Sequence, residues 1–279
     1  MYKAFKIEGN ELNLEIDDSL IEDYKLLGKT VFENTKSRIN SNLEAFKDND
    51  GVIDGSKLSN NWFPQIEADV FISHSHKDFD TALILAGIIA SKNLTPFIDS
   101  CVWGYADDLL KAIDKQYCKN EGSVYYDYNK RNYSTSHVHM MLTIALTKML
   151  YNTECLIFLN TPNSIYPKND IPTDYFDATL SPWIYAEMEM TNFLRPQTKE
   201  KHRIVQKAFS EGREDLKIFH TAETPTIQKV VVSDFINWTN HEYSSKEQAL
   251  DNLYLINQIQ NHIVEGTTRR TIYGNRQGR

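Results

Sequence analysis

The chain has 279 residues, of which 41% are hydrophobic and 11% aromatic, and its formal net charge is −8. This composition supplies a sizeable core and excludes a disordered or fibrous chain. The acidic balance argues against nucleic-acid binding, which requires clustered lysine and arginine. The 3 cysteines include no Cys-x-x-Cys pair, and no apolar stretch approaches the ~20 residues of a membrane span. We therefore expect a cytoplasmic protein with reduced thiols and no direct membrane insertion.

Residues 1–66 are predicted to form an N-terminal extension of short strands and helices. The partial alternation of apolar residues from Ile7 to Ile16 predicts a short strand or hairpin. Asp17-Asp18-Ser19 is typical of a helix start, and residues 20–46 have the spacing of one or two amphipathic helices. Residues 56–66 are expected to be a connector.

From residue 67 onward, strand-like and helix-like segments alternate. Strands are expected at 69–73, 95–99 and 154–159, with further strands near 217–220 and 229–232. Helices are expected after Asp78 and at 107–117, 137–150, 183–194 and 246–263. The tyrosine-rich stretch 118–136 is predicted to be an inserted hairpin or loop. This alternation predicts an α/β domain over 67–235 with a parallel sheet flanked by helices, then a C-terminal helix and basic tail over 236–279.

Four sequence elements stand at strand ends or at the start of a helix. They are Asp69-Val70-Phe71-Ile72-Ser73, Phe97-Ile98-Asp99 followed by Gly104 and Leu109, Leu159-Asn160-Thr161-Pro162-Asn163-Ser164, and Ser181-Pro182-Trp183-Ile184-Tyr185-Ala186-Glu187. Together and in this order they resemble the TIR (Toll/interleukin-1 receptor) domains, and the last is similar to the Ser-x-Trp-x-x-x-Glu element of catalytically active members. The resemblance covers about residues 67–235. His74, Ser75 and His76 depart from it, because some active TIR domains carry basic residues there.

The resemblance implies a flavodoxin-like fold and an enzyme that cleaves the nicotinamide glycosidic bond of NAD⁺, with Glu187 as the catalytic carboxylate. NAD⁺ is then the substrate, and no cofactor is implied. Similar stand-alone bacterial proteins act in antiphage defence of the Thoeris type, which implies self-association, a phage-derived trigger and an effector reached through a nucleotide signal. Water as the nucleophile gives ADP-ribose, the adenine of the substrate gives a cyclic product, and another small molecule gives a conjugate.

Elementary chemistry supports a role for Glu187 independently. Trp183 and Glu187 are an i,i+4 pair, so both lie on one face near the start of their helix. In open α/β sheets, ligands bind beyond the carboxyl ends of the strands. Because nicotinamide leaves a cationic pyridinium as a neutral ring, it needs no general acid, and a single anion stabilises the oxocarbenium-like ribose. We expect the other substrate contacts to come from Trp183, Trp103, Phe71, Ser73, Asp99 and Ser164.

Two other functions stay open at this point. Many TIR domains are non-catalytic adaptors that act through TIR–TIR contact, although adaptors need not keep the Trp-x-x-x-Glu pair. A nucleoside-processing enzyme of related fold would instead form a glycosyl ester on a glutamate. The His-x-His pairs at His74/His76 and His137/His139 have no cysteine or acid at a convincing spacing, so no metal site is predicted.

Overall fold

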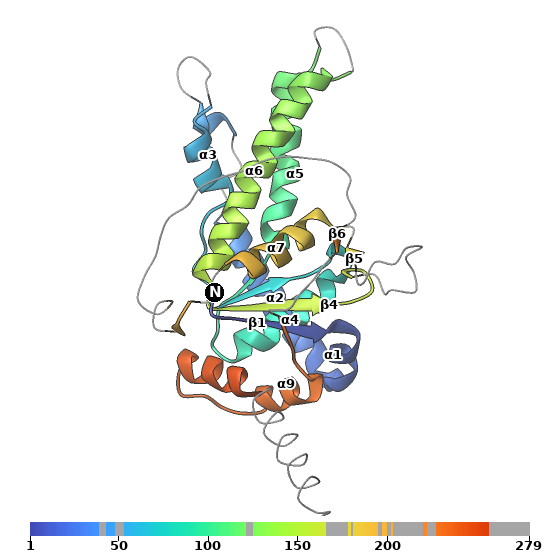
Figure 1. Cartoon of the computed structure of the whole chain (residues 1–279), viewed down its shortest axis with the longest axis vertical. Helices are drawn as coiled ribbons and strands as arrows, with labels where there is room; N and C mark the ends of the chain where they lie inside the picture. The colour runs from blue at the N-terminus through green and yellow to red at the C-terminus, as the bar shows by residue number, and fades with distance from the viewer. Residues whose placement is uncertain are drawn as a thin grey trace, which may run out of the picture.

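The protein is an α/β structure in which helices flank a five-stranded, all-parallel sheet (Figure 1). The computed structural model describes residues 1–38, 43–47, 53–120, 125–165, 178–179, 181–194, 197–199, 202, 220–221 and 227–256. The sheet order is β3-β2-β4-β1-β7, which is consistent with a flavodoxin-like fold and confirms the expected class. No helix in the described part of the chain is long and apolar enough to cross a membrane.

The three expected central strands are confirmed. They are β2 (Val70–Ser73), β3 (Pro96–Ile98) and β4 (Cys155–Asn160), and β2 and β4 are almost wholly buried. Two short strands, β5 (Ala178–Thr179) and β6 (His220–Thr221), pair separately in an antiparallel ladder. The strand expected at 229–232 is shorter, because β7 (Gln228–Lys229) ends before Val232 begins helix α9 (Val232–Thr239).

The N-terminal segment is part of the sheet, which corrects the expected extension. Strand β1 (Lys3–Glu8) pairs in parallel with β4 and with β7. In a flavodoxin-like order of 2-1-3-4-5, the strand following β4 would take this fourth place. Here β1 takes it. A short strand or hairpin was expected from Ile7 to Ile16. The strand is β1, but it ends at Glu8, and no hairpin forms because helix α1 (Gly9–Glu15) follows directly and places Leu12 in the core.

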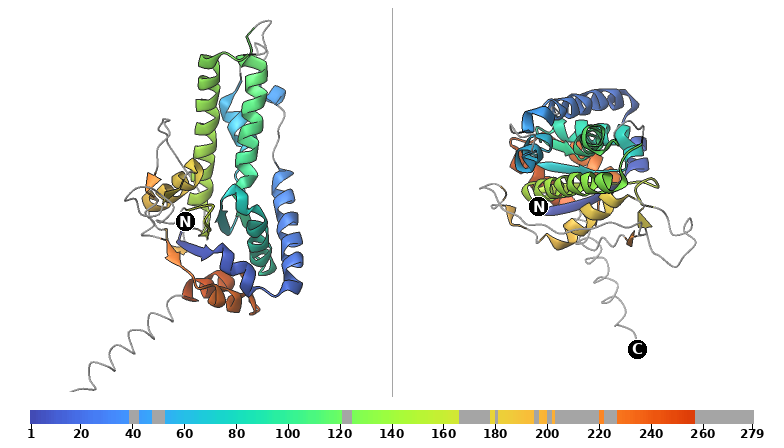
Figure 2. Two further views of the ribbon diagram at one scale, coloured as in Figure 1. Left: turned by 90° about the vertical axis from the view of Figure 1, so that its right-hand side faces the viewer. Right: turned by 90° about the horizontal axis from the view of Figure 1, so that it is seen from above.

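Helices α2 (Asp18–Lys36) and α4 (Phe79–Ser91) lie on one face of the sheet, and helix α7 (Pro182–Phe193) lies on the other (Figures 1 and 2). The backbones of α2 and α4 meet at two glycines. A Cβ atom on Gly87 would lie 1.8 Å from the carbonyl oxygen of Tyr24, and one on Gly28 would lie 1.9 Å from that of Leu83. This approach anchors α2 to the helix that follows β2.

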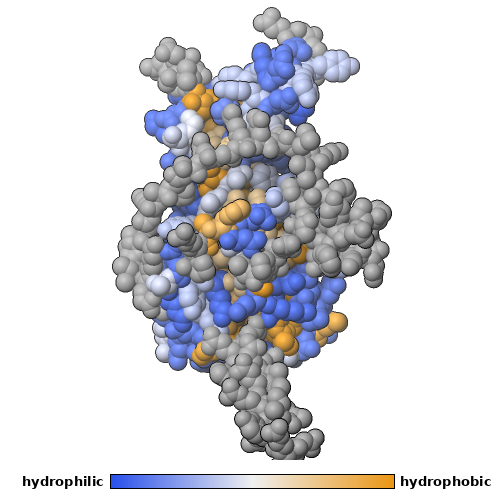
Figure 3. All heavy atoms as spheres, viewed as in Figure 1, coloured by the Kyte–Doolittle hydropathy of each residue, from blue (hydrophilic) through white to orange (hydrophobic). Residues whose placement is uncertain are grey.

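The expected insertion is the tip of a long helical hairpin, here called the arm. Helix α5 (Ser100–Ile113) continues through a π-helical turn at Asp114–Cys118, and helix α6 (Tyr128–Asn152) returns beside it (Figure 2). Both helices begin earlier than expected. The side chains at the end of the arm range from hydrophilic to intermediate in hydropathy (Figure 3), and Tyr125, Tyr128 and Tyr133 are 68–78% exposed there.

The predicted connector is also helical. Helix α3 (Gly55–Trp62) begins after Asp54, whose side chain accepts hydrogen bonds from the backbone N–H groups of Ser56 and Lys57. Trp62 is buried, and its indole N–H donates to the carbonyl oxygen of Tyr105 in α5. A short 3₁₀ helix at Leu43–Phe46 precedes α3. This packing supports the base of the arm.

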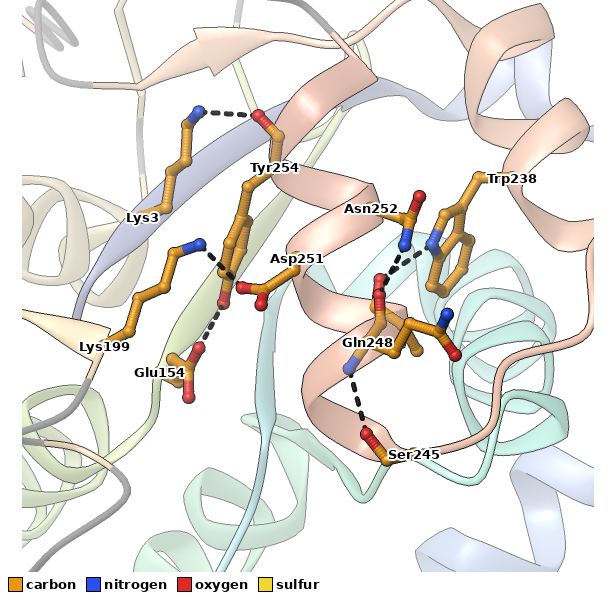
Figure 4. Close-up of polar contacts among 10 residues, drawn as sticks. Lys3, Glu154, Lys199, Trp238, Ser245, Gln248, Asp251, Asn252 and Tyr254 are labelled. Atoms are coloured by element: carbon orange, nitrogen blue, oxygen red, sulfur yellow. Dashed lines mark hydrogen bonds and ion pairs between the residues drawn. The ribbon is translucent and has the colours of Figure 1, made fainter.

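The expected C-terminal helix begins at residue 246 and is described as far as 256; its predicted end lies outside the described residues. It packs at the amino ends of β1 and β4, where the Tyr254 hydroxyl donates to Glu154 and Lys3 donates to the Tyr254 carbonyl oxygen (Figure 4). Lys199 and Asp251 form an ion pair nearby. Trp238 of α9 donates its indole N–H to the Ala249 carbonyl oxygen. The helix therefore covers the edge of the sheet opposite to the candidate site.

Candidate active site

Polar residues follow three neighbouring strands at the carboxyl edge of the sheet. Ser73 ends β2 and His74 follows it, Asp99 follows β3, and Thr161 follows β4. The chain crosses from β2 to β3 on one side, and β4 lies on the other side of β2. The topological switch point, where open α/β sheets bind ligands, therefore lies between β2 and β4.

Helix α7 is held over this switch point by apolar contacts with β4. Ser181 accepts a hydrogen bond from the N–H of Ile184, and Pro182 occupies the first turn, as the sequence predicted. Ile184 and Met188, four residues apart, pack against Phe158 of β4. Phe158 is the register partner of Ser73, so the two side chains share a face of the sheet. Packing on Phe158 thus places the adjoining Glu187 above Ser73.

The carboxyl group of Glu187 is enclosed by protein. The side chain is 1% exposed, and Ser73 Oγ donates a hydrogen bond of 2.5 Å to its Oε2 atom. The Oε1 atom is buried and receives no hydrogen bond from a donor in the described part of the chain. Glu187 also interacts with the carboxyl group of Asp99, with which it forms a hydrogen bond when one of the two carries a proton. The site therefore pairs two buried acids.

Asp99 is the more firmly held acid of the pair. Its carboxylate accepts from the backbone N–H of Ser100 at 2.7 Å and from that of His74 at 3.3 Å. The His74 imidazole Nδ1 lies 2.6 Å from Asp99 Oδ1, and both side chains are fully buried. Burial lowers the pKa of His74 to about 3, so the imidazole ring is neutral.

The protonation state of the pair follows from these contacts. Burial raises the pKa of Glu187 well above its usual value, and the neighbouring Asp99 raises it further, while the Ser73 hydrogen bond opposes the rise. Burial also raises the pKa of Asp99, against the hydrogen bonds that it accepts. Because Asp99 accepts hydrogen bonds from two backbone N–H groups and Glu187 accepts one from Ser73, the ionised form belongs to Asp99 and the proton to Glu187.

A second polar cluster borders the first across the switch point. Asp78 accepts hydrogen bonds from the hydroxyl of Thr161 at 2.5 Å and from the side-chain amide of Asn163 at 2.8 Å. These contacts tie the turn after β2 to the turn after β4. The negative charge of Asp78 also raises the pKa of His74, but the opposite effect of burial is larger.

The structure brings together some of the predicted site residues and separates others. Ser73, Asp99 and Glu187 meet. Phe71 is fully buried and packs on Phe97, with ring centroids 5.4 Å apart, so it is a core residue. Ser164 is also fully buried and bonds to the backbone of Thr161, where it stabilises the turn after β4.

The two predicted tryptophans have different outcomes. Trp183 is partly buried, and its ring meets the His139 ring of α6 edge-on at 5.3 Å, so it braces α7 against the arm. Trp103 and Gly104, expected in a loop after β3, lie within α5, because Asp99 caps that helix at once. The side chain of Trp103 lies outside the described part of the structure.

His74, Asp78 and Asn163 complete the site but were not predicted as site residues. His74 was noted only as a departure from the TIR pattern. Its position as the first residue beyond a buried strand was the signal available, because that position faces the same edge as Asp99 and Thr161. Among the described residues, no group of three or more histidines, cysteines or acids is arranged to hold a metal ion.

Comparison with known proteins gives no further guide to this arrangement. No protein-family model, curated protein or solved structure matches the chain.

Proposed function

We propose that the protein cleaves the N-glycosidic bond of NAD⁺ and releases nicotinamide, with Glu187 stabilising the ribosyl cation. The observation that carries this proposal is the position of Glu187: a carboxyl group held by Ser73 and paired with Asp99 at the switch point of a parallel sheet. Buried acids with perturbed pKa values at such an edge are typical of catalytic sites. The resemblance of the four motifs to TIR domains supports the same chemistry.

The chemistry requires little beyond one anion. Breaking the bond between ribose C1 and the pyridinium nitrogen returns an electron pair to nicotinamide, which leaves neutral. The ionised Glu187 then stabilises the positive charge on the ribose, and a nucleophile adds to C1. ADP-ribose forms when the nucleophile is water, and a cyclic product forms when it is the substrate's own adenine. We further propose an intracellular role in antiphage signalling, which suits the three free, buried cysteines.

The burial of Glu187 favours a second candidate function. A carboxyl group that is 1% exposed is closed to a dinucleotide, so catalysis requires the site to open. A non-catalytic adaptor that acts through contact between copies has no such requirement, and the acid pair would then be structural. We favour the enzyme, because a structural role gives no reason to bury two interacting acids for which the described residues supply no cation.

Nicotinamide release separates the two functions. The purified protein is incubated at high concentration with NAD⁺, products are identified by mass spectrometry, and NAD⁺ is also followed in expressing cells during phage infection. Glu187→Gln is expected to lower turnover ~100- to 1,000-fold, as loss of a single electrostatic stabiliser does. Glu189→Gln, on the same helix, is the control. Equal turnover by the wild type and Glu187→Gln, or no release in either setting, contradicts the enzymatic proposal.

A further inference from the structure

The acid pair of Asp99 and Glu187 has a feature that simple anionic catalysis does not require: among the described residues, no lysine or arginine interacts with either carboxyl group. Asp99 and Glu187 interact with Ser73, His74 and the backbone at Ser100. His74 adjoins Asp99, and Asp78 acts in turn on His74; the charges of Asp99, Glu33 and Lys36 act on Cys101. His74 is neutral, Asp78 is acidic, and burial with the charge of Asp99 raises the pKa of the Cys101 thiol.

Because the described residues supply no cation, the positive charge that balances these two acids must come from a proton or from a ligand. The backbone N–H groups of His74 and Ser100 hold the Asp99 carboxylate, while Glu187 Oε1 receives no hydrogen bond from any donor among the described residues. In the resting protein, a proton on Glu187 neutralises one of the two carboxylates. A ligand cation near Glu187 can balance the same negative charge, provided that the proton leaves.

We propose that Asp99 is a positioning residue that holds the proton on Glu187 until the cationic ring of the substrate displaces it. The proposal rests on the function proposed above. On binding, the O–H bond of the Glu187 carboxyl group breaks and the proton passes to bulk water, leaving the carboxylate beside the substrate. Cleavage of the glycosidic bond then proceeds as described. The ligand class is an N-ribosyl pyridinium, and the opened site selects it by charge.

Two ligands that differ mainly in charge can test whether the site selects its ligand by charge. NAD⁺ and NADH differ in the charge of one ring and otherwise present the same groups. Titration calorimetry in two buffers of different ionisation enthalpy is expected to detect the release of about one proton on NAD⁺ binding and of none on NADH binding. Equal proton release with both ligands overturns the proposal. This measurement uses the wild-type chain and does not depend on the folding of a variant.

Kinetics test the role of Asp99 itself. The proton on Glu187 competes with the substrate. A plot of KM for NAD⁺ against pH should therefore have a break at the pKa of Glu187, below which KM rises ~10-fold for each pH unit while kcat changes little. Asp99→Asn is expected to move this break toward acid, because the neighbouring negative charge is lost. Asp107→Asn, an exposed acid of the same helix, is the control. An unmoved break with a reduced kcat would indicate a merely structural role and overturn the proposal.

Infrared spectroscopy separates failure of this inference from failure of the proposed function. The protein without ligand is expected to have a protonated-carboxyl band at neutral pH that Glu187→Gln removes. Absence of the band overturns the inference whether or not NAD⁺ is cleaved. A band with no nicotinamide release overturns the proposed function and leaves the shared proton established.

Discussion

Replacement of Glu187 by glutamine has a consequence for folding stability that is independent of any substrate. Burial and Asp99 raise the pKa of Glu187 in the folded protein above the ordinary 4.5 of the unfolded chain. The folded state therefore binds this proton more tightly than the unfolded state does. The free energy of unfolding contributed by this group is greatest below about pH 4.5 and falls as the pH rises toward the folded pKa.

The magnitude follows from the linkage of one proton to folding. Each pH unit between the unfolded and folded pKa values lowers the free energy of unfolding of the wild type by up to about 1.4 kcal/mol relative to Glu187→Gln. Between the ordinary pKa of 4.5 and the raised pKa of the folded protein, the free energy of unfolding of Glu187→Gln should therefore increase relative to that of the wild type as the pH rises. The side-chain amide introduced by Glu187→Gln can also donate a hydrogen bond to Asp99. Unlike an ionised Glu187, it does not repel the Asp99 carboxylate.

Urea unfolding monitored by circular dichroism at closely spaced pH values measures this difference. Glu189→Gln on the same helix controls for the loss of one acid from α7. The two unfolding curves of wild type and Glu187→Gln should diverge with rising pH. A difference that stays constant within about 0.5 kcal/mol across this range would refute the shared proton and the buried electrostatics from which it was derived.

Two further predictions concern the scaffold. Gly87→Ala should lower the free energy of unfolding by about 1–3 kcal/mol in urea titrations, because its Cβ would meet the Tyr24 carbonyl oxygen at 1.8 Å. Gly104→Ala, in open space on α5, should instead stabilise by up to about 1 kcal/mol, and similar effects at both glycines would contradict the close approach. Tyr254→Phe should cost about 1 kcal/mol and speed amide exchange in residues 246–256, because the hydroxyl that donates to Glu154 is lost; unchanged exchange would exclude that anchor.

Much of the sheet was predictable because buried parallel strands carry a local signature. Val70–Ser73 and Cys155–Asn160 are continuous apolar runs, and both were located within one residue of their bounds. Strand β1 has no such signature for its place in the sheet. Its partner β4 begins at Cys155, so only the tertiary structure identifies β1 as central. Pairing over such a distance leaves no trace in a local pattern.

Helix starts were missed where one residue serves two roles. Asp99 was expected to end a strand, and it does, but its side chain also accepts from the next N–H group and starts α5. Gly104 suggested a loop, yet it is tolerated in that helix at a cost of about 1 kcal/mol. The same dual role explains the candidate site. The convergence of Ser73, Asp99 and Glu187 follows from parallel strand ends, whereas their burial depends on packing that no motif specifies.

The place of β1 in the sheet also affects how the chain is made. Ribosomes add about 5–20 residues per second, so β4 emerges roughly 8–30 s after β1. Throughout that interval the first strand has neither of its lateral neighbours, and its apolar side chains and unpaired peptide groups must be shielded by other means. The earliest strand to be synthesised is thus among the last to be secured, and translation speed and chaperone supply should govern the yield of active protein.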